Sequence, residues 1–225
     1  MPRNEYQKQL DALREDVLYM SELVDDRLRV GLNALKQKDE AMAEEVITGD
    51  DQVNELYLDL EQDCIDLLAL QQPVAGDLRF IAASFKIITD LERIADLATN
   101  LGRYARQADS DVVPEVDVQR IGDLTVEMLG EAMSAYADGD PGLCRQVGAR
   151  DDDLDDFCKA ASDSVVRDLI ERDDVLAEDV SVEEIMNDVS RLLLTIRDLE
   201  RVGDHAVNVA ARSLYMVEND DELIY

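Results

Sequence analysis

The sequence predicts an all-α protein made of two tandem three-helix bundles, six helices in all, related by internal duplication. Three observations predict this class. Apolar residues recur at steps of three and four along every long segment, which is the spacing of an amphipathic helix. No segment shows the period-two alternation of a strand. Residues 90–96, DLERIAD, are repeated as DLERVGD 108 positions later in a chain of 225 residues, as expected of a duplicated unit.

The first half is expected to span residues 1–110. Apolar positions from Tyr6 onward predict a first long helix, and Asp39 can cap a second. Pro73 and Gly76 should end that second helix. The third helix contains the first copy of the repeat, and the polar residues 108–116 link the halves. The three helices are expected at about 6–36, 40–72 and 77–107.

The second half is expected to span residues 111–225 and to repeat this plan. Asp140 can cap its middle helix, with Pro141 in the first turn. The last long helix contains the second copy of the repeat, and the tail from Glu218 is expected to fray. The three helices are expected at about 117–136, 141–171 and 181–217.

Each copy of the repeat continues a helix face that is apolar in the preceding turns. Within the repeat, the residues on that face are polar. The residues at spacing i, i+4, i+8 are Glu92, Asp96 and Asn100, and then Glu200, Asp204 and Asn208. Carboxylates one turn apart at the edge of a core repel each other and lose solvation unless a cation neutralises them. Hard metal ions take such oxygen ligands, so we expect a metal site, with the asparagines as additional candidate ligands. The alternative is a solvated face of an acidic helix.

The middle helices carry a second, weaker repeat, 101 residues apart. Asp50 and Asn54 in the first half match Asp151 and Asp155 in the second, again at spacing i, i+4. If the middle and third helices of each half pack antiparallel, these pairs face the repeat and complete a four-residue cluster. Spacing alone does not exclude the neighbouring pairs Asp51 with Glu55, and Asp152 with Asp156. The apolar neighbours Val53 and Leu154 favour the first set.

Composition narrows the range of partners. The formal net charge is −31, from 53 acidic and 22 basic residues, yet hydrophobic residues reach 46%, which is typical of a folded chain. Such a charge argues against binding to nucleic acid or to anionic membrane surfaces. Repulsion within so acidic a chain is damped in molar salt, where the Debye length falls to about 3 Å. We therefore expect a halophilic origin.

The chain also carries the marks of a cytoplasmic protein. No apolar run approaches the roughly 20 residues of a membrane span, and the first residues lack an apolar signal segment. The three cysteines, Cys64, Cys144 and Cys158, form no CxxC pair. We expect them to be reduced core residues of a cytoplasmic protein that does not insert into the membrane.

These motifs resemble the PhoU family, the phosphate-uptake regulators, over about residues 5–217. The resemblance lies in LERIAD and LERVGD, in the segments around Asp50 and Asp151, and in QPVAGDLR at residues 72–79, which is similar to the family's QPxAxDLR. It implies two three-helix bundles whose E(D)xxxD motifs bind multinuclear iron or zinc clusters. The ligand positions implied are Asp50, Glu92, Asp96, Asp151, Asp155, Glu200 and Asp204, with Asn54 as a departure from the acidic pattern.

The resemblance also implies a function. The family negatively regulates the phosphate regulon and high-affinity phosphate uptake, through contacts with the ATPase subunit of the phosphate ABC transporter and, in bacteria, with a sensor kinase. We therefore expect a non-catalytic, metal-binding regulator that forms a homodimer, with iron or zinc as the cofactor.

Two other classes of function remain open. One is a metal-free helical scaffold that acts only by binding partners. The other is a carboxylate-bridged di-metal enzyme, which usually requires a Glu-x-x-His motif from each of two helices. The only histidine is His205, so the chain cannot supply two such ligands.

Overall fold

The computed structural model describes residues 3–70, 73–107, 116–171 and 181–224, and within these ranges every regular element is a helix. The all-α class predicted from the sequence is confirmed. The helices are α1 (Arg3–Gln37), α2 (Glu40–Thr48), α3 (Asp50–Leu70), α4 (Ala75–Arg106), α5 (Val118–Asp138), α6 (Pro141–Glu171) and α7 (Val182–Glu218).

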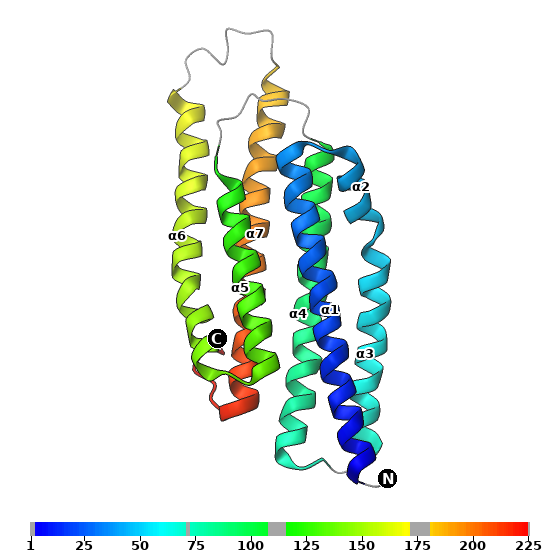
Figure 1. The fold of residues 1–225 in the computed structure, drawn as a ribbon. Helices are drawn as coiled ribbons and strands as arrows, with labels where there is room; N and C mark the ends of the chain where they lie inside the picture. The colour runs from blue at the N-terminus through cyan, green and yellow to red at the C-terminus, as the bar shows by residue number, and fades with distance from the viewer. Residues whose placement is uncertain (1–2, 71–72, 108–115, 172–180, 225) are drawn as a thin grey trace.

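The helices form two bundles that stand side by side (Figure 1). α1 to α4 form the first bundle and α5 to α7 the second. In the first bundle α1 and α4 run parallel and α2 and α3 run antiparallel to them; in the second α5 and α7 run parallel and α6 runs antiparallel to them. α4 and α7 lie in the middle of the molecule and pack against each other, so both copies of the repeat lie where the two halves meet. One continuous apolar core runs through both bundles. This arrangement confirms the predicted pair of three-helix bundles.

The second expected helix is interrupted at Gly49, so the described residues form seven helical segments rather than six. Gly49 donates its N–H to the Glu45 carbonyl at 3.0 Å, and α3 begins at the next residue. The side chain of Arg27, from α1, crosses at this point: a Cβ on residue 49 would lie 2.3 Å from Arg27 Nη1. Glycine, which has the weakest helix propensity after proline, leaves the space for that arginine.

The turn between the first two helices of each half is the same turn, displaced by 101 residues. Lys38 and Gly139 both adopt the left-handed conformation, with φ of 51° and 64°. The next residues, Asp39 and Asp140, each accept hydrogen bonds from two backbone N–H groups of the following helix. The two predicted caps are confirmed, and the duplication is visible in the backbone as well as in the sequence.

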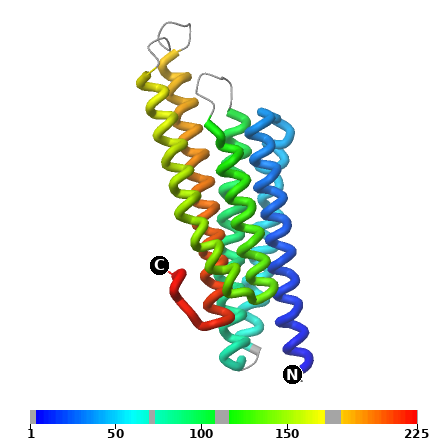
Figure 2. The backbone as a smooth tube through the Cα atoms, turned by 60° about the vertical axis from the view of Figure 1, so that its left-hand side comes forward, coloured from blue at the N-terminus to red at the C-terminus, as the bar shows by residue number. Residues whose placement is uncertain are grey.

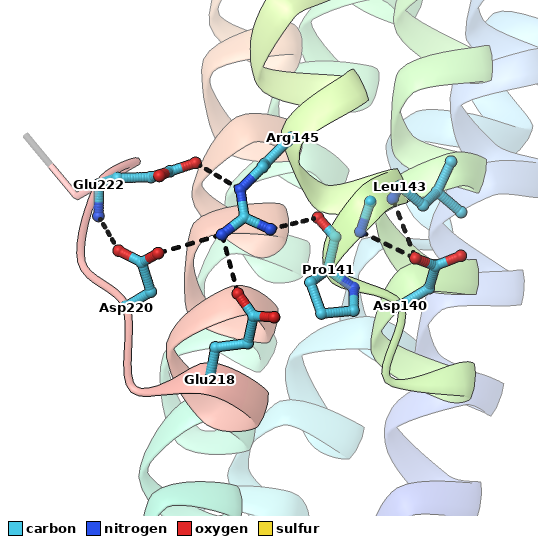
Figure 3. A network of polar contacts seen from close by, with 8 residues as sticks. Asp140, Pro141, Leu143, Arg145, Glu218, Asp220 and Glu222 are labelled. Atoms are coloured by element: carbon cyan, nitrogen blue, oxygen red, sulfur yellow. Dashed lines mark hydrogen bonds and ion pairs between the residues drawn. The ribbon is translucent and has the colours of Figure 1, made fainter.

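The C-terminal tail does not fray as expected; residues 219–224 fold back onto the start of α6 (Figure 2). The guanidinium of Arg145 accounts for this, because it donates to two tail carboxylates and to the carboxylate at the end of α7 (Figure 3). They are Glu218 at 2.8 Å, Asp220 at 3.1 Å and Glu222 at 2.7 Å. Single exposed charges would not have suggested this, since isolated surface ion pairs contribute little.

Other expectations concern the cysteines and the linker. The three cysteines are free and buried, as predicted. None of the helices among the described residues is both long and apolar enough to cross a membrane. Most of the expected linker at 108–116 lies outside the described residues.

Candidate metal centre

The second half brings four predicted carboxylates together across one helix pair. Asp151 and Asp155 lie on α6, and Glu200 and Asp204 lie on the antiparallel α7. The charges of Asp155, Asp204 and Glu200 all act on Asp151. The predicted cluster is therefore present as a group of interacting carboxylates.

Close approach of the two helices depends on Gly203. A Cβ at this position would lie 2.0 Å from Cδ2 of Leu154, so the leucine would have to move aside for any larger residue. Leu154 is fully buried, and it lies between the two acidic residues of the cluster on α6, three residues after Asp151 and directly before Asp155. The apolar contact thus fixes the register in which the carboxylates face each other.

The cluster is strained electrostatically. Burial and then repulsion by Asp155 and other carboxylates raise the pKa of Asp151 from 3.8 to about 6. Burial followed by Asp155 also raises the pKa values of Glu200 and Asp204. One oxygen of Asp151, Oδ1, is buried without a hydrogen-bond partner. A cation is the group that would relieve both features.

Cys158 lies beside the same cluster as a buried thiol. Burial, and after it the charges of Glu200, Asp155 and Asp204, raise the pKa of this thiol to about 12. A metal-binding cysteine must be a thiolate. The four carboxylates of the cluster offer oxygen ligands, which suit a hard cation.

The alternative register proposed from spacing is not the one that faces the partner helix. Asp51, Glu55, Asp152 and Asp156 are all exposed, but so are Asp155 and Asp204 of the predicted cluster, so the interactions and not the exposure separate the two sets. Asp50 and Asp151, one residue earlier, are partly buried and interact with the third helix of their halves. The structure thus brings together the set that the apolar neighbours favoured.

The donor set fits a metal ion in its chemistry but not yet in its positions. Within the four described ranges, no group of three or more His, Cys, Asp or Glu side chains is arranged to hold a metal ion as it stands. The second-half carboxylates supply charge and an unpartnered oxygen, but their side chains would have to turn toward a common point.

The first half arranges its predicted cluster differently. Asp50 accepts hydrogen bonds from Thr99 at 3.3 Å and from Asn54 at 3.1 Å. Glu92 and Asp96 lie within range of its charge: burial and neighbouring carboxylates raise both of their pKa values. The four predicted residues are neighbours here too, but Asp50 is already engaged by the protein.

The two asparagines take a different role from the one expected. Asn100 donates to Asp198 at 3.1 Å and accepts from Arg103 at 2.9 Å, so both of its polar atoms bond to residues outside the predicted first-half cluster. Asn208 lies at the equivalent place and donates to Asp90 at 3.4 Å. Each asparagine therefore bonds to the first aspartate of the repeat in the other half, because α4 and α7 pack against each other.

Sequence reasoning missed the polar contacts of Asp90 and Asp198 across α4 and α7, which form a joint between the two halves. Asp90 and Asp198 open the two repeats and are 8% and 0% exposed. Asp90 pairs with His205 at 2.9 Å, and Asp198 accepts from the hydroxyl of Tyr104 at 2.8 Å. Buried polar groups need such partners. The signal was available: an aspartate beside a core leucine recurs in both copies.

Comparison with known proteins also shows the duplication. The PhoU domain family model matches residues 17–105 and again residues 118–213. A phosphate-specific transport system accessory protein PhoU homolog from Pseudomonas aeruginosa is 32% identical over 220 residues, covering 96% of this chain and 87% of that protein. The PhoU homolog 1 from Methanothermobacter thermautotrophicus is 32% identical over 219 residues, covering 96% and 95%.

Solved structures agree with this. The crystal structure of PhoU from Pseudomonas aeruginosa has a TM-score of 0.83 at 31% identity, covering 96% of this chain and 100% of that one. The phosphate transport system regulatory protein PhoU from Streptococcus pneumoniae has a TM-score of 0.84 at 25% identity, covering 96% and 98%. Family model, relatives and fold agree along nearly the whole chain, and the chain belongs to the PhoU family.

Proposed function

We propose that the protein is a cytoplasmic negative regulator of phosphate uptake that acts by contacting the ATPase subunit of the phosphate ABC transporter. The observation that carries this proposal is the likeness over 96% of the chain to accessory proteins of the phosphate-specific transport system. A signalling protein is a second expected partner. The acidic surface, with a net charge of −31, suits a protein partner and molar salt rather than nucleic acid.

Metal binding is the second part of the proposal. Asp151, Asp155, Glu200 and Asp204 bind iron or zinc, which neutralises carboxylates that repel one another. The support is the pKa of about 6 at Asp151 and its unpartnered Oδ1. The metal supplies positive charge that fixes α6 against α7. Because it binds the folded chain preferentially, it stabilises the fold by mass action.

A metal-free scaffold is the competing function, and one observation favours it: no described group of acidic, His or Cys side chains converges on a metal position. Elemental analysis separates the two. After incubation with iron or zinc and gel filtration, the wild type should retain metal and Glu200→Gln/Asp204→Asn should not. Equal metal contents in the two proteins would reject the site.

The di-metal enzyme is not favoured by any observation. Its chemistry needs histidine ligands, and the single His205 hydrogen-bonds to Asp90 across the joint between the halves. The Nδ1 atom of that imidazole is thus engaged by Asp90.

The regulatory proposal is tested in cells. Deleting the gene should raise phosphate uptake or transporter expression in phosphate-rich medium, because a restraint is removed. Affinity purification from phosphate-replete cells should recover the transporter ATPase. Unchanged uptake in both rich and poor medium would reject the regulatory role. Size-exclusion chromatography with light scattering at molar salt tests the expected homodimer.

A further inference from the structure

The shared turn gives residues 17–70 of the first half counterparts at residues 118–171 of the second. Besides the left-handed residue and the aspartate cap, the turn repeats a backbone hydrogen bond: Asp39 donates to Ala34, and Asp140 donates to Ala135. The displacement is 101 residues throughout this hairpin, and the repeat on α4 and α7 is displaced by 108. Differences between the two acidic clusters can therefore be read position by position.

Arg27 occupies the first-half cluster. Its side chain is only 13% exposed, and Nη2 donates to the Val46 carbonyl at 2.6 Å. The same nitrogen lies 3.5 Å from the hydroxyl of Thr99 and 3.6 Å from Oδ1 of Asp50. Room for it comes from Gly49 at the break between α2 and α3. A buried guanidinium thus supplies positive charge directly beside the carboxylate predicted to bind metal.

The second half has none of these features at the matching positions. The counterpart of Arg27 is Met128, which is fully buried among apolar side chains. Val207 replaces Thr99, and Asp155 replaces Asn54. The counterpart of Gly49 is Arg150, whose guanidinium lies 3.3 Å from the carboxylates of Glu127 and Glu131 on α5.

These replacements change what each cluster can accept. In the first half, Asp50 faces a guanidinium through one oxygen and accepts from Asn54 through the other. A metal ion there would meet a fixed like charge and an amide in place of a carboxylate. In the second half, Asp151 keeps a buried oxygen without a partner and is surrounded by other carboxylates.

We propose that the first-half cluster is not a metal site, and that Arg27 is a built-in counter-cation doing there what a metal ion does in the second half. Arg27 connects α1 to the α2–α3 break and to α4 through its contacts with Val46, Asp50 and Thr99. These contacts do not require a metal ion. The two halves are therefore unequal: one is held by a protein cation and the other by an exchangeable one. The statement about the second half rests on the proposed metal binding, whereas the statement about Arg27 does not.

The test is a transplant of the second-half residues into the first half of the full-length protein. In a Glu200→Gln/Asp204→Asn background, which should hold no metal, Arg27→Met with Asn54→Asp should restore bound iron or zinc. Adding Glu92→Gln/Asp96→Asn should remove it again. The matched control, Arg29→Met with Asn54→Asp, removes an exposed arginine of the same helix that pairs with Asp25, and should restore nothing.

Two further measurements, of metal content and of melting temperature, test the two parts of the proposal separately. In the otherwise wild-type protein, Glu92→Gln/Asp96→Asn should leave the metal content unchanged. A loss equal to that of Glu200→Gln/Asp204→Asn would overturn the proposal. An Arg27→Met/Asn54→Asp transplant that folds but binds no metal would also overturn it. With chelator present, Arg27→Met should lower the melting temperature more than Arg29→Met does. Equal melting temperatures would overturn the counter-cation role even if the wild type binds no metal, a result that would reject the metal proposal separately.

Discussion

The carboxylate cluster of the second half should weaken the metal-free protein, and replacing Asp151 with asparagine should therefore strengthen it. The rise of the Asp151 pKa from 3.8 to about 6 corresponds to about 3 kcal/mol at about 1.4 kcal/mol per pKa unit. Since the side chain is partly exposed, solvent screening reduces this to about 1–2 kcal/mol. At about 2–4 °C per kcal/mol for a chain of this length, Asp151→Asn should melt about 2–8 °C higher.

The sign of the pH dependence follows from linkage. Below pH 3.8 the carboxyl is protonated in both the folded and unfolded states, so ionisation costs the fold nothing. As the pH rises from 3.8 to 6, the unfolded state loses its proton first and the wild type is destabilised, with the full cost reached above about pH 6. The gain of Asp151→Asn should therefore be complete at pH 7.5 and vanish toward pH 4.

The assay is thermal unfolding followed by circular dichroism, with chelator present and salt held constant. The matched control is Asp152→Asn, which removes the same charge from the next residue, an exposed one. It should change the melting temperature little. Equal gains from the two variants would refute the reasoning, since they would show that net charge alone, rather than repulsion inside the cluster, limits stability.

Three further predictions follow from the fold. With a net charge of −31, helical circular dichroism or the cooperative melt should be lost between molar and tens of millimolar salt; a constant melting temperature would remove the halophilic interpretation. Tyr104→Phe removes the hydrogen bond that the Tyr104 hydroxyl donates to buried Asp198. It should lower the free energy of unfolding in urea by about 1–3 kcal/mol, and Tyr57→Phe should lower it by less. Arg145→Gln should free the C-terminal tail for carboxypeptidase, as followed by mass spectrometry, and Arg167→Gln should not; equal digestion would argue against the Arg145 contacts.

The fold could be predicted because its signals are local and repeated. Apolar periodicity set the helices, and the caps Asp39 and Asp140 set the ends of the turns. The break at Gly49 was not predictable in the same way. Its cause is an arginine 22 positions away on another helix, and only the packed structure shows that contact.

The site could be predicted in part. Spacing along a helix placed Asp151 with Asp155, and Glu200 with Asp204, and antiparallel packing brought the two pairs together. Spacing could not reveal that the first half holds Arg27, because the charge comes from a third helix. Spacing also could not separate metal-ligand candidates from residues that bond the two halves together. Asn100 continues the i, i+4 series of Glu92 and Asp96, yet its side chain bonds to Asp198 in the other half.

The measurement that tests the account most directly is phosphate uptake in a deletion strain complemented with three versions of the gene, grown in phosphate-rich medium. Wild type should restore the restraint on uptake. Glu200→Gln/Asp204→Asn should fail to restore it, because the second-half cluster loses its metal, whereas Glu92→Gln/Asp96→Asn should restore it, because Arg27 already holds the first half. Full restoration by the Glu200→Gln/Asp204→Asn variant, at equal protein abundance, would contradict a metal-dependent regulator.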